Sequence, residues 1–363
     1  MRHKIRLHER ITSWLAGKFA ARHSPTAPRR GPVTHVIILD GTMSSLMDGE
    51  ETNAGRTYRL LQELGAGVSL YYEAGVQWHS WRQTLNVMMG RGINRQIRRA
   101  YGYLASRYRP GDRIFLMGYS RGAFAVRSLA GVIDRVGLLK ASCATERNIR
   151  TAYRHYELTP DSAAAADFAQ AHCHESIDIE MIGVWDTVKA LGARVPLLWR
   201  FTERRHAFHN HHLSPIVRHG FQALALDETR EVFEPEMWMC PTRWDARIEQ
   251  VWFRGSHGDI GGQLGAFEEA RPLANIPLVW MLERLEMCDL TLPDGWRDRF
   301  IMDPQAPSVG TWRHWGKFFL FRARRLVSAD RSESIHPTAQ PFVNAGDTKA
   351  RLPEQQGTLA AQD

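Results

Sequence analysis

Short apolar runs alternate with segments of helical periodicity from residue 33 onward. The runs are nearly continuous in apolar character, which is typical of strands that are buried on both faces of a parallel sheet. One helix is predicted at residues 93–108, where Ile97, Tyr101 and Leu104 recur at helical spacing. The alternation predicts an α/β fold with a mainly parallel sheet flanked by helices. The predicted strands are residues 34–39, 68–72, 113–117, 177–185 and 250–253.

The pentapeptide Gly118-Tyr119-Ser120-Arg121-Gly122 follows the third predicted strand and precedes a helical segment. In a strand–turn–helix context, a Gly-x-Ser-x-Gly sequence presents the serine hydroxyl above the sheet, and the glycines leave room for the turn. We therefore predict Ser120 as a nucleophile, with Gly118 and Gly122 forming its elbow. The N–H of Arg121, at the start of the helix, is predicted to face a developing oxyanion. An ordinary glycine-rich turn is the competing interpretation.

A serine hydroxyl needs a base before it can act as a nucleophile at neutral pH. His257 follows the last predicted strand in a glycine-rich loop and is the predicted base, with His336 as its rival. Asp186 ends the fourth predicted strand and fits the order serine, acid, histidine, so it is predicted to orient the imidazole. Asp259 is the competing carboxylate. Its closeness to His257 in the sequence is more typical of a residue that shapes the loop.

The loop after the first strand is the expected source of a second oxyanion donor. The backbone N–H of Gly41 or Thr42 is predicted for this role, and Asp40 is predicted to fix the loop. This chemistry requires no cofactor. No metal site is predicted, because a cluster of histidines lacks carboxylate or thiolate partners at a recognisable spacing. The cluster consists of His206, His209, His211 and His212.

The net charge of +8 is concentrated at one end of the chain. Residues 1–30 hold eight Lys and Arg against one Glu, so they account for seven of the eight net charges. A nucleic-acid-binding domain would carry a basic face of its own, so no nucleic-acid partner is predicted. Residues 4–22 fit a basic amphipathic helix that could lie on an anionic membrane, or else dock on the domain or fray. Their dispersed apolar residues are unlike a secretory signal peptide, and no apolar run reaches the length of a membrane span.

Six short motifs follow one another along the chain: residues 38–42 (ILDGT), 111–112 (GD), 118–123 (GYSRGA), 183–188 (GVWDTV), 226–230 (LDETR) and 251–262 (VWFRGSHGDIGG). Taken together and in this order, they resemble the α/β-hydrolase domain of type VI secretion phospholipase effectors, a family also catalogued as a domain of unknown function. The resemblance spans about residues 33–340. It implies an α/β-hydrolase fold, a triad of Ser120, Asp186 and His257, and hydrolysis of phospholipid esters. An immunity protein is implied as a partner if the chain is an effector.

The sequence departs from the family pattern at two places. Met43 and Ser44 follow the first motif where an aromatic residue or glycine and then asparagine are common, and Gln263 replaces a third glycine. The predicted organisation is a basic leader and linker, a catalytic domain with two cap insertions, and a disordered tail. These parts are residues 1–30, 31–340, about 188–248 and 300–335 for the caps, and 341–363.

The predicted function is cleavage of carboxylic esters, with phospholipids as the substrate class. Two alternatives stay open: a carboxylesterase for small soluble esters, and a non-catalytic, membrane-associated binding protein on a hydrolase scaffold. The expected locations are the cytoplasm, a membrane surface, or outside the cell after export by a specialised secretion system.

Overall fold

The computed structural model describes residues 30–75, 91–188, 212–240, 247–312, 321–327 and 330–343. Its contacts divide the chain into one unit ending at Pro32 and a second unit beginning at Val33, and the fold below is that of the second unit. Almost all of the predicted leader and tail lie outside the described residues, as do residues 189–211 and 241–246 of the first predicted cap insertion and residues 313–320 and 328–329 of the second. These assignments therefore stay predictions.

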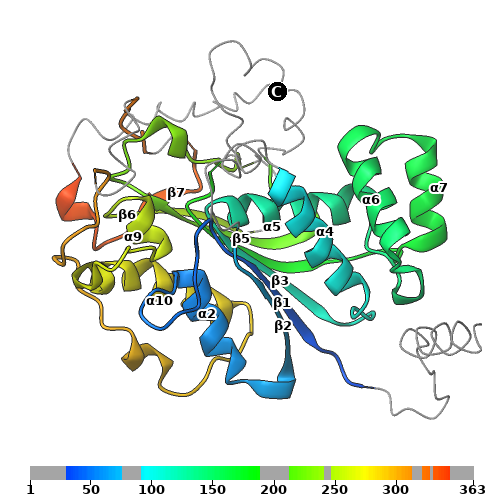
Figure 1. Ribbon diagram of the computed structural model, residues 1–363, viewed down its shortest axis with the longest axis horizontal. Helices are drawn as coiled ribbons and strands as arrows, with labels where there is room; N and C mark the ends of the chain where they lie inside the picture. Colours follow the sequence, from blue (N-terminus) through cyan, green and yellow to red (C-terminus); the bar gives the residue numbers. More distant parts are fainter. Residues whose placement is uncertain are drawn as a thin grey trace, which may run out of the picture. The chain divides into compact units, whose positions relative to one another are not determined.

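Within the described ranges, seven strands form one sheet in the order β2-β1-β3-β4-β5-β6-β7 (Figure 1). Every neighbouring pair is parallel, so the carboxyl ends of the strands share one edge of the sheet. Ligands of open α/β sheets bind at that edge. The predicted fold class is confirmed. The strands are β1 Thr34–Leu39, β2 Val68–Glu73, β3 Arg113–Tyr119, β4 Ile179–Trp185, β5 Val217–Ala225, β6 Arg247–Phe253 and β7 Glu333–Ile335.

Two strands of this sheet were not predicted. β5 lies inside the range assigned to the first cap insertion, and β7 lies inside the second. Polar residues interrupt β5, so it lacks the apolar pattern of the other strands. One of these residues, Gln222, is fully buried and accepts a hydrogen bond from the Thr187 hydroxyl at 3.1 Å. Residues 217–225 and 333–335 therefore belong to the sheet rather than to a cap.

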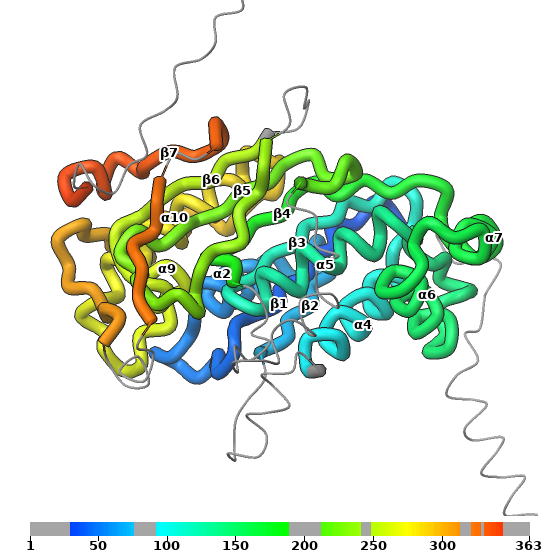
Figure 2. Tube along the Cα trace, turned by 90° about the horizontal axis from the view of Figure 1, so that it is seen from above, coloured from blue at the N-terminus to red at the C-terminus, as the bar shows by residue number. Residues whose placement is uncertain are grey.

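Helices cover both faces of the sheet (Figures 1 and 2). Alternate side chains of a strand point to opposite faces. Ile37 and Leu39 accordingly join one core with α4 and α5, while Val36 and Ile38 join another with α2 and α10. Each helix in the described ranges is too short or too polar to cross a membrane. The helices are α2 Asn53–Gln62, α4 Arg91–Ala105, α5 Arg121–Val136, α6 Glu146–Leu158, α7 Ala163–His172, α9 His257–Gly261 and α10 Arg271–Met287.

Candidate active site

Ser120 occupies the single residue between β3 and α5. Its backbone has φ 57° and ψ −120°. A positive φ in a non-glycine residue costs on the order of 1–3 kcal/mol and persists only where the surroundings enforce it. The turn has the conformation that lifts a serine hydroxyl above the end of a parallel sheet.

The two glycines of the turn are required by close backbone contacts. A Cβ on Gly118 would lie 2.7 Å from the Ala123 nitrogen. A Cβ on Gly122 would lie 2.0 Å from the Leu39 carbonyl oxygen, where β1 passes directly behind the turn. Backbone atoms cannot rotate away as a flexible side chain can, so any larger residue at these positions would force the turn and β1 apart.

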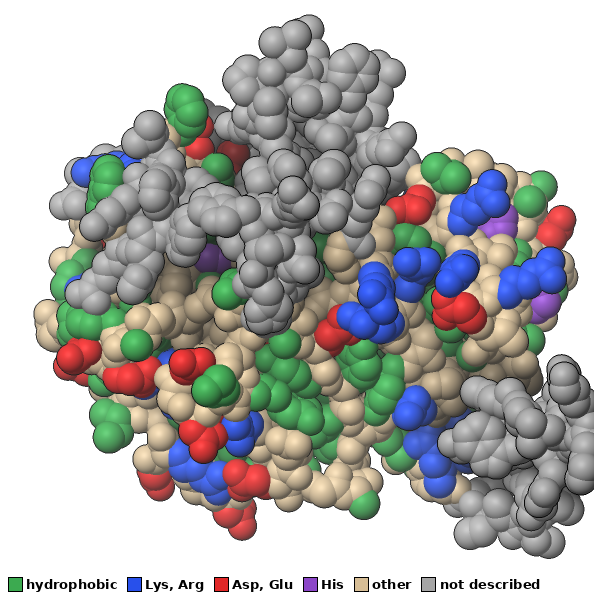
Figure 3. Space-filling view, in the orientation of Figure 1, with side chains coloured by type: hydrophobic (Ala, Val, Ile, Leu, Met, Phe, Trp, Pro, Cys, Tyr) green, Lys and Arg blue, Asp and Glu red, His purple; other side chains and the backbone are tan. Residues whose placement is uncertain are grey.

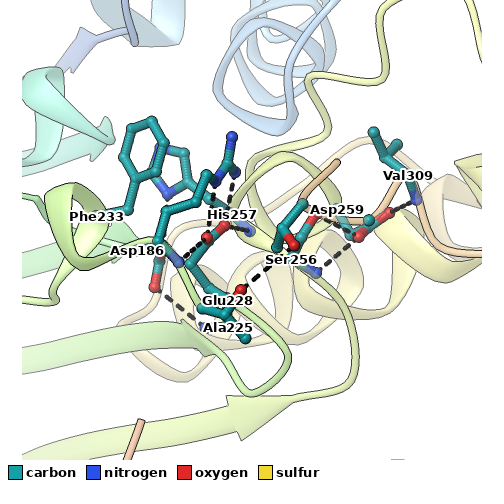
Figure 4. A network of polar contacts seen from close by, with 12 residues as sticks. Asp186, Ala225, Glu228, Phe233, Ser256, His257, Asp259 and Val309 are labelled. Carbon is teal, nitrogen blue, oxygen red and sulfur yellow. Dashed lines mark hydrogen bonds and ion pairs between the residues drawn. The ribbon is translucent and has the colours of Figure 1, made fainter. Parts of the chain in front are cut away.

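The structure brings Ser120, His257 and Asp186 together. His257 Nε2 lies 2.9 Å from Ser120 Oγ, and His257 Nδ1 lies 2.6 Å from Asp186 Oδ2. Figure 4 shows the His257 ring beside the Asp186 carboxylate. All three side chains are buried. They follow β3, β4 and β6, whose carboxyl ends share one edge of the sheet, and this explains how residues 137 positions apart come into contact.

His336, the rival base, lies elsewhere. Its ring stacks on Phe253 at a centroid distance of 4.6 Å, and its Nδ1 is 2.8 Å from the Thr338 hydroxyl. Burial lowers the pKa of His336 to about 4. The His336 ring therefore has a packing role at the end of β6.

Four residues not singled out as site residues hold His257 in place, directly or through a partner. Its ring lies between Tyr119, at 4.9 Å, and Phe233, at 4.7 Å and nearly parallel. Its backbone N–H donates to Glu228 Oε2 at 3.1 Å, and Arg230 forms an ion pair with the same carboxylate at 2.6 Å. The LDETR motif therefore anchors the histidine loop. No sequence signal marked Phe233, whose position depends on the path of the chain after β5.

The Asp186 carboxylate accepts four hydrogen bonds. Oδ2 accepts from His257 and from Arg325 Nη2 at 3.0 Å, while Oδ1 accepts from Arg325 Nη1 at 2.6 Å and from the Ala225 N–H at 3.1 Å. Burial alone would raise the pKa of Asp186, but the Arg325 guanidinium and the hydrogen bond from His257 outweigh burial and hold that pKa well below its usual range. Sequence reasoning missed Arg325, which is 139 residues from Asp186.

Asp259, the competing carboxylate, closes the loop around His257. It accepts from the Ser256 N–H at 2.7 Å and the Ser256 hydroxyl at 2.8 Å, and it also accepts from Ser308 and from the Val309 N–H at 2.8 Å. In Figure 4 it points towards Val309 and away from Asp186. These contacts support the interpretation that Asp259 shapes the loop.

The loop after β1 carries the residues predicted as a second oxyanion donor. The Gly41 N–H already donates to Asp40 Oδ1 at 2.7 Å. Asp40, Thr42 and Arg121 line one small hollow together with residues near Gly75 and α4. The Gln263 side chain donates to the Thr42 carbonyl at 2.9 Å, so this departure from the family's glycine helps to fix the loop. Of the residues predicted as oxyanion donors, Thr42 and Arg121 therefore line the same cavity.

We expect Asp40 to make stability depend on pH. Burial raises the pKa of Asp40 from 3.8 to about 6, despite hydrogen bonds from Thr52, Tyr72 and Gly41 that favour ionisation. Between these values the folded protein keeps a proton that the unfolded chain has released. The free energy of unfolding therefore falls as pH rises through this window, by about 3 kcal/mol relative to a non-titrating residue.

Urea unfolding of the wild type and of Asp40→Asn at pH 4 and pH 7 measures this difference. The variant should gain stability relative to the wild type as pH rises. Parallel pH dependence of the two proteins would contradict the prediction.

The predicted histidine cluster lies mostly outside the described residues. His212 is described, and its Nδ1 is 3.2 Å from the Met239 carbonyl oxygen. In the part of the chain that the structure describes, no three His, Cys, Asp or Glu side chains are grouped so that they could hold a metal ion.

Comparison with known proteins identifies relatives of this chain. A family model described as "T6SS, Phospholipase effector Tle1-like, catalytic domain" matches residues 34–284. The uncharacterized protein YEL023C of Saccharomyces cerevisiae is 28% identical over 226 residues, which cover 55% of this chain and 32% of that protein. The chain therefore spans about a third of the length of this curated relative.

Two solved structures are also similar. One is an uncharacterized protein from Pseudomonas aeruginosa, with a TM-score of 0.43 and 14% identity, covering 82% of this chain and 51% of that one. The other is a Tle1 effector bound to the VgrG spike of a type VI secretion system, with a TM-score of 0.29 and 15% identity, covering 65% of this chain and 52% of that one. Because the family model matches well over half of the chain, the protein belongs to the family of Tle1-like type VI secretion phospholipase effectors, through their catalytic domain.

Proposed function

We propose that the protein is a serine hydrolase that cleaves carboxylic ester bonds of phospholipids. The observation that carries this proposal is the hydrogen-bonded series Ser120–His257–Asp186 at the carboxyl edge of the sheet. Membership of a phospholipase effector family supports hydrolysis of lipid esters as the general activity. The hydrogen-bonded series and the family membership together favour catalysis over a binding role on an inactive scaffold.

In the proposed mechanism His257 removes the proton of Ser120 while the hydroxyl attacks the ester carbonyl. The 2.9 Å separation of these groups lies within the range that direct proton transfer requires. Ionised Asp186 holds the imidazole in one tautomer and stabilises the imidazolium that forms. The tetrahedral oxyanion accepts hydrogen bonds from the N–H groups of Arg121 and Thr42, and each such donor is typically worth about 10²–10³ in rate.

Collapse of the tetrahedral intermediate releases the alcohol part of the substrate, which takes the proton from His257. The acyl group stays on Ser120 as an ester. Water then attacks this acyl-enzyme by the same route, with His257 again as the base, and the fatty acid leaves. No cofactor takes part in these steps.

Exposed apolar side chains near the C-terminal segments support a lipid substrate. Trp312, Phe321 and Leu326 are 58%, 76% and 48% exposed, and Arg322 stacks on the Trp312 ring at 3.6 Å. Figure 3 shows separate hydrophobic side chains among charged ones along the left edge of the view. Aromatic side chains beside basic ones are typical of surfaces that enter the interface of a bilayer.

Covalent labelling with a fluorophosphonate tests the nucleophile. Such probes react with serines that an adjacent base activates. We expect one label per wild-type molecule, none on Ser120→Ala, and wild-type labelling of Ser106→Ala, which removes an exposed serine in the turn after α4. Equal labelling of Ser120→Ala, or an unlabelled but folded wild type, would refute the proposal.

Release of fatty acid tests the substrate class. Phospholipid vesicles and a soluble short-chain ester are compared at equal concentrations of ester. Faster hydrolysis at the vesicle surface supports a phospholipase. Turnover of the soluble ester alone would instead identify a carboxylesterase.

Family membership also suggests partners and a location for the chain. Delivery by a type VI secretion machine is proposed, together with an immunity protein that protects the producing cell. Residues 4–22, which lie outside the described residues, are proposed as a peripheral membrane contact. Co-purification with the spike protein tests the proposed delivery, and co-purification with vesicles tests the proposed membrane contact.

A further inference from the structure

The Asp186 carboxylate has a cationic partner in addition to His257. Arg325 approaches it with two nitrogens, Nη1 at 2.6 Å from Oδ1 and Nη2 at 3.0 Å from Oδ2. This bidentate geometry fixes the plane of the carboxylate as well as its position. Arg325 is only 8% exposed, so the ion pair is shielded from water and salt.

The guanidinium is itself held by backbone carbonyls. Nη1 donates to the Ala225 oxygen at 2.9 Å, at the end of β5, and Nη2 donates to the Phe233 oxygen. The same Phe233 stacks its ring on His257. Arg325 therefore ties the acid to the segment that supports the histidine, and the relative position of the two groups depends on it.

Arg325 reaches this position from residues 321–327, here called the strap. The strap is fixed by the Ala323 N–H, which donates to the Thr229 carbonyl at 2.8 Å, and by the Glu231 N–H, which donates to the Phe321 carbonyl at 3.2 Å. It lies beyond residue 284, where the family model ends. The pairing between Arg325 and Asp186 is thus a feature of this chain that the family match does not describe.

We propose that Arg325 is a positioning residue of the active site, which orients Asp186 and offsets its charge so that His257 stays available as a base at lower pH. This proposal rests on the proposed function. A buried carboxylate beside an imidazole favours the protonated ring, and a cation that neutralises the carboxylate weakens that effect.

The surrounding charges leave this role to Arg325. Glu228, whose carboxylate faces the backbone of His257, is already paired with Arg230 at 2.6 Å. Their charges nearly cancel. Among the described residues, Tyr119 on β3 and Asp40 after β1 also interact with this cluster.

The experiment compares Arg325→Met and Arg325→Lys with Arg324→Met, a matched loss of charge at an exposed neighbour. The pH dependence of kcat/KM is measured, and the His257 ring is titrated by NMR in parallel. For Arg325→Met we expect the acid limb of the kcat/KM profile and the titration of the His257 ring both to move to higher pH, because the ring then faces a carboxylate that no cation offsets. We also expect kcat to fall by about 10²-fold with little change in KM, because the acid loses its orientation.

Arg325→Lys keeps the positive charge but loses the bidentate geometry. It should leave the acid limb near its wild-type position and restore only part of kcat, while Arg324→Met should match the wild type in both. If Arg325→Met does not fold, the lysine variant alone tests the proposal. The positioning role would be overturned if Arg325→Met left the acid limb of kcat/KM and the His257 titration unchanged. It would also be overturned if Arg325→Lys shifted both as far as Arg325→Met does.

Failure of this proposal can be told apart from failure of the proposed function. The NMR titration needs no turnover, so a shift in the ring of His257 would support the charge pairing even in a protein that fluorophosphonate does not label. If fluorophosphonate labels the wild type but the His257 titration is the same with and without Arg325, the hydrolase proposal stands and the positioning role is refuted.

Discussion

Replacing His257 by alanine is expected to lower ester hydrolysis by about 10⁴–10⁶-fold, because Ser120 then loses the base that contacts it. The His257 ring lies within hydrogen-bond distance of the Ser120 hydroxyl, at 2.9 Å, and it also connects that hydroxyl to Asp186. Its removal should lower kcat and leave KM close to the wild-type value, since the ring acts on the reacting atoms. Steady-state kinetics with a soluble ester measures the loss.

His336→Ala is the matched control, because this residue was the rival base. Its ring stacks on Phe253 and contacts Thr338, away from Ser120. We expect its kcat to stay within a few-fold of the wild type, with some loss of stability from the vacated packing. Equal damage from the two variants, or substantial activity in His257→Ala, would rule out the assigned base.

Replacing Gly122 by alanine is expected to destabilise the fold by about 3 kcal/mol or more and to abolish labelling of Ser120. The added Cβ would meet the Leu39 and Asp40 carbonyl oxygens at 2.0 and 2.5 Å. Relief requires β1 and the turn to separate, which would move the nucleophile and the loop of Thr42 in opposite directions. Urea unfolding and fluorophosphonate labelling measure the two consequences.

Gly67→Ala serves as the control for this substitution. A Cβ at Gly67 meets no atom within 4 Å, so stability should change by less than about 1 kcal/mol. A Gly122→Ala variant that is as stable and as reactive as Gly67→Ala would show that the close approach to β1 is unimportant.

The sequence predicted the strands that are buried on both faces. β1, β3 and β4 have nearly continuous apolar runs, and the elbow and the acid were found because they directly follow β3 and β4. The histidine loop was found because it follows the short apolar end of β6. β5 was missed because Arg218, His219 and Gln222 interrupt its pattern, and a buried glutamine with hydrogen-bond partners cannot be distinguished from an exposed one by its residue type.

Contacts made by irregular segments were out of reach of sequence patterns. Phe233 and Arg325 contact His257 and Asp186 through the tertiary path of the chain rather than through a period or a motif. Asp40 was predicted to fix its loop, and its hydrogen bond to the Gly41 N–H gives that role a physical basis. The catalytic roles of the site residues stay predictions until the variants are measured.

The order of the site residues along the chain has a consequence for biosynthesis. Ser120 leaves the ribosome long before His257 and Arg325, and at 5–20 residues per second the interval between Ser120 and Arg325 is about 10–40 s. Until residue 257 is made, the nascent chain carries Ser120 without its proposed base, and until residue 325 is made Asp186 lacks its arginine partner. An enzyme that works by the proposed mechanism would therefore be inactive while it is being made, and a chain that ends before residue 257 would lack the proposed base.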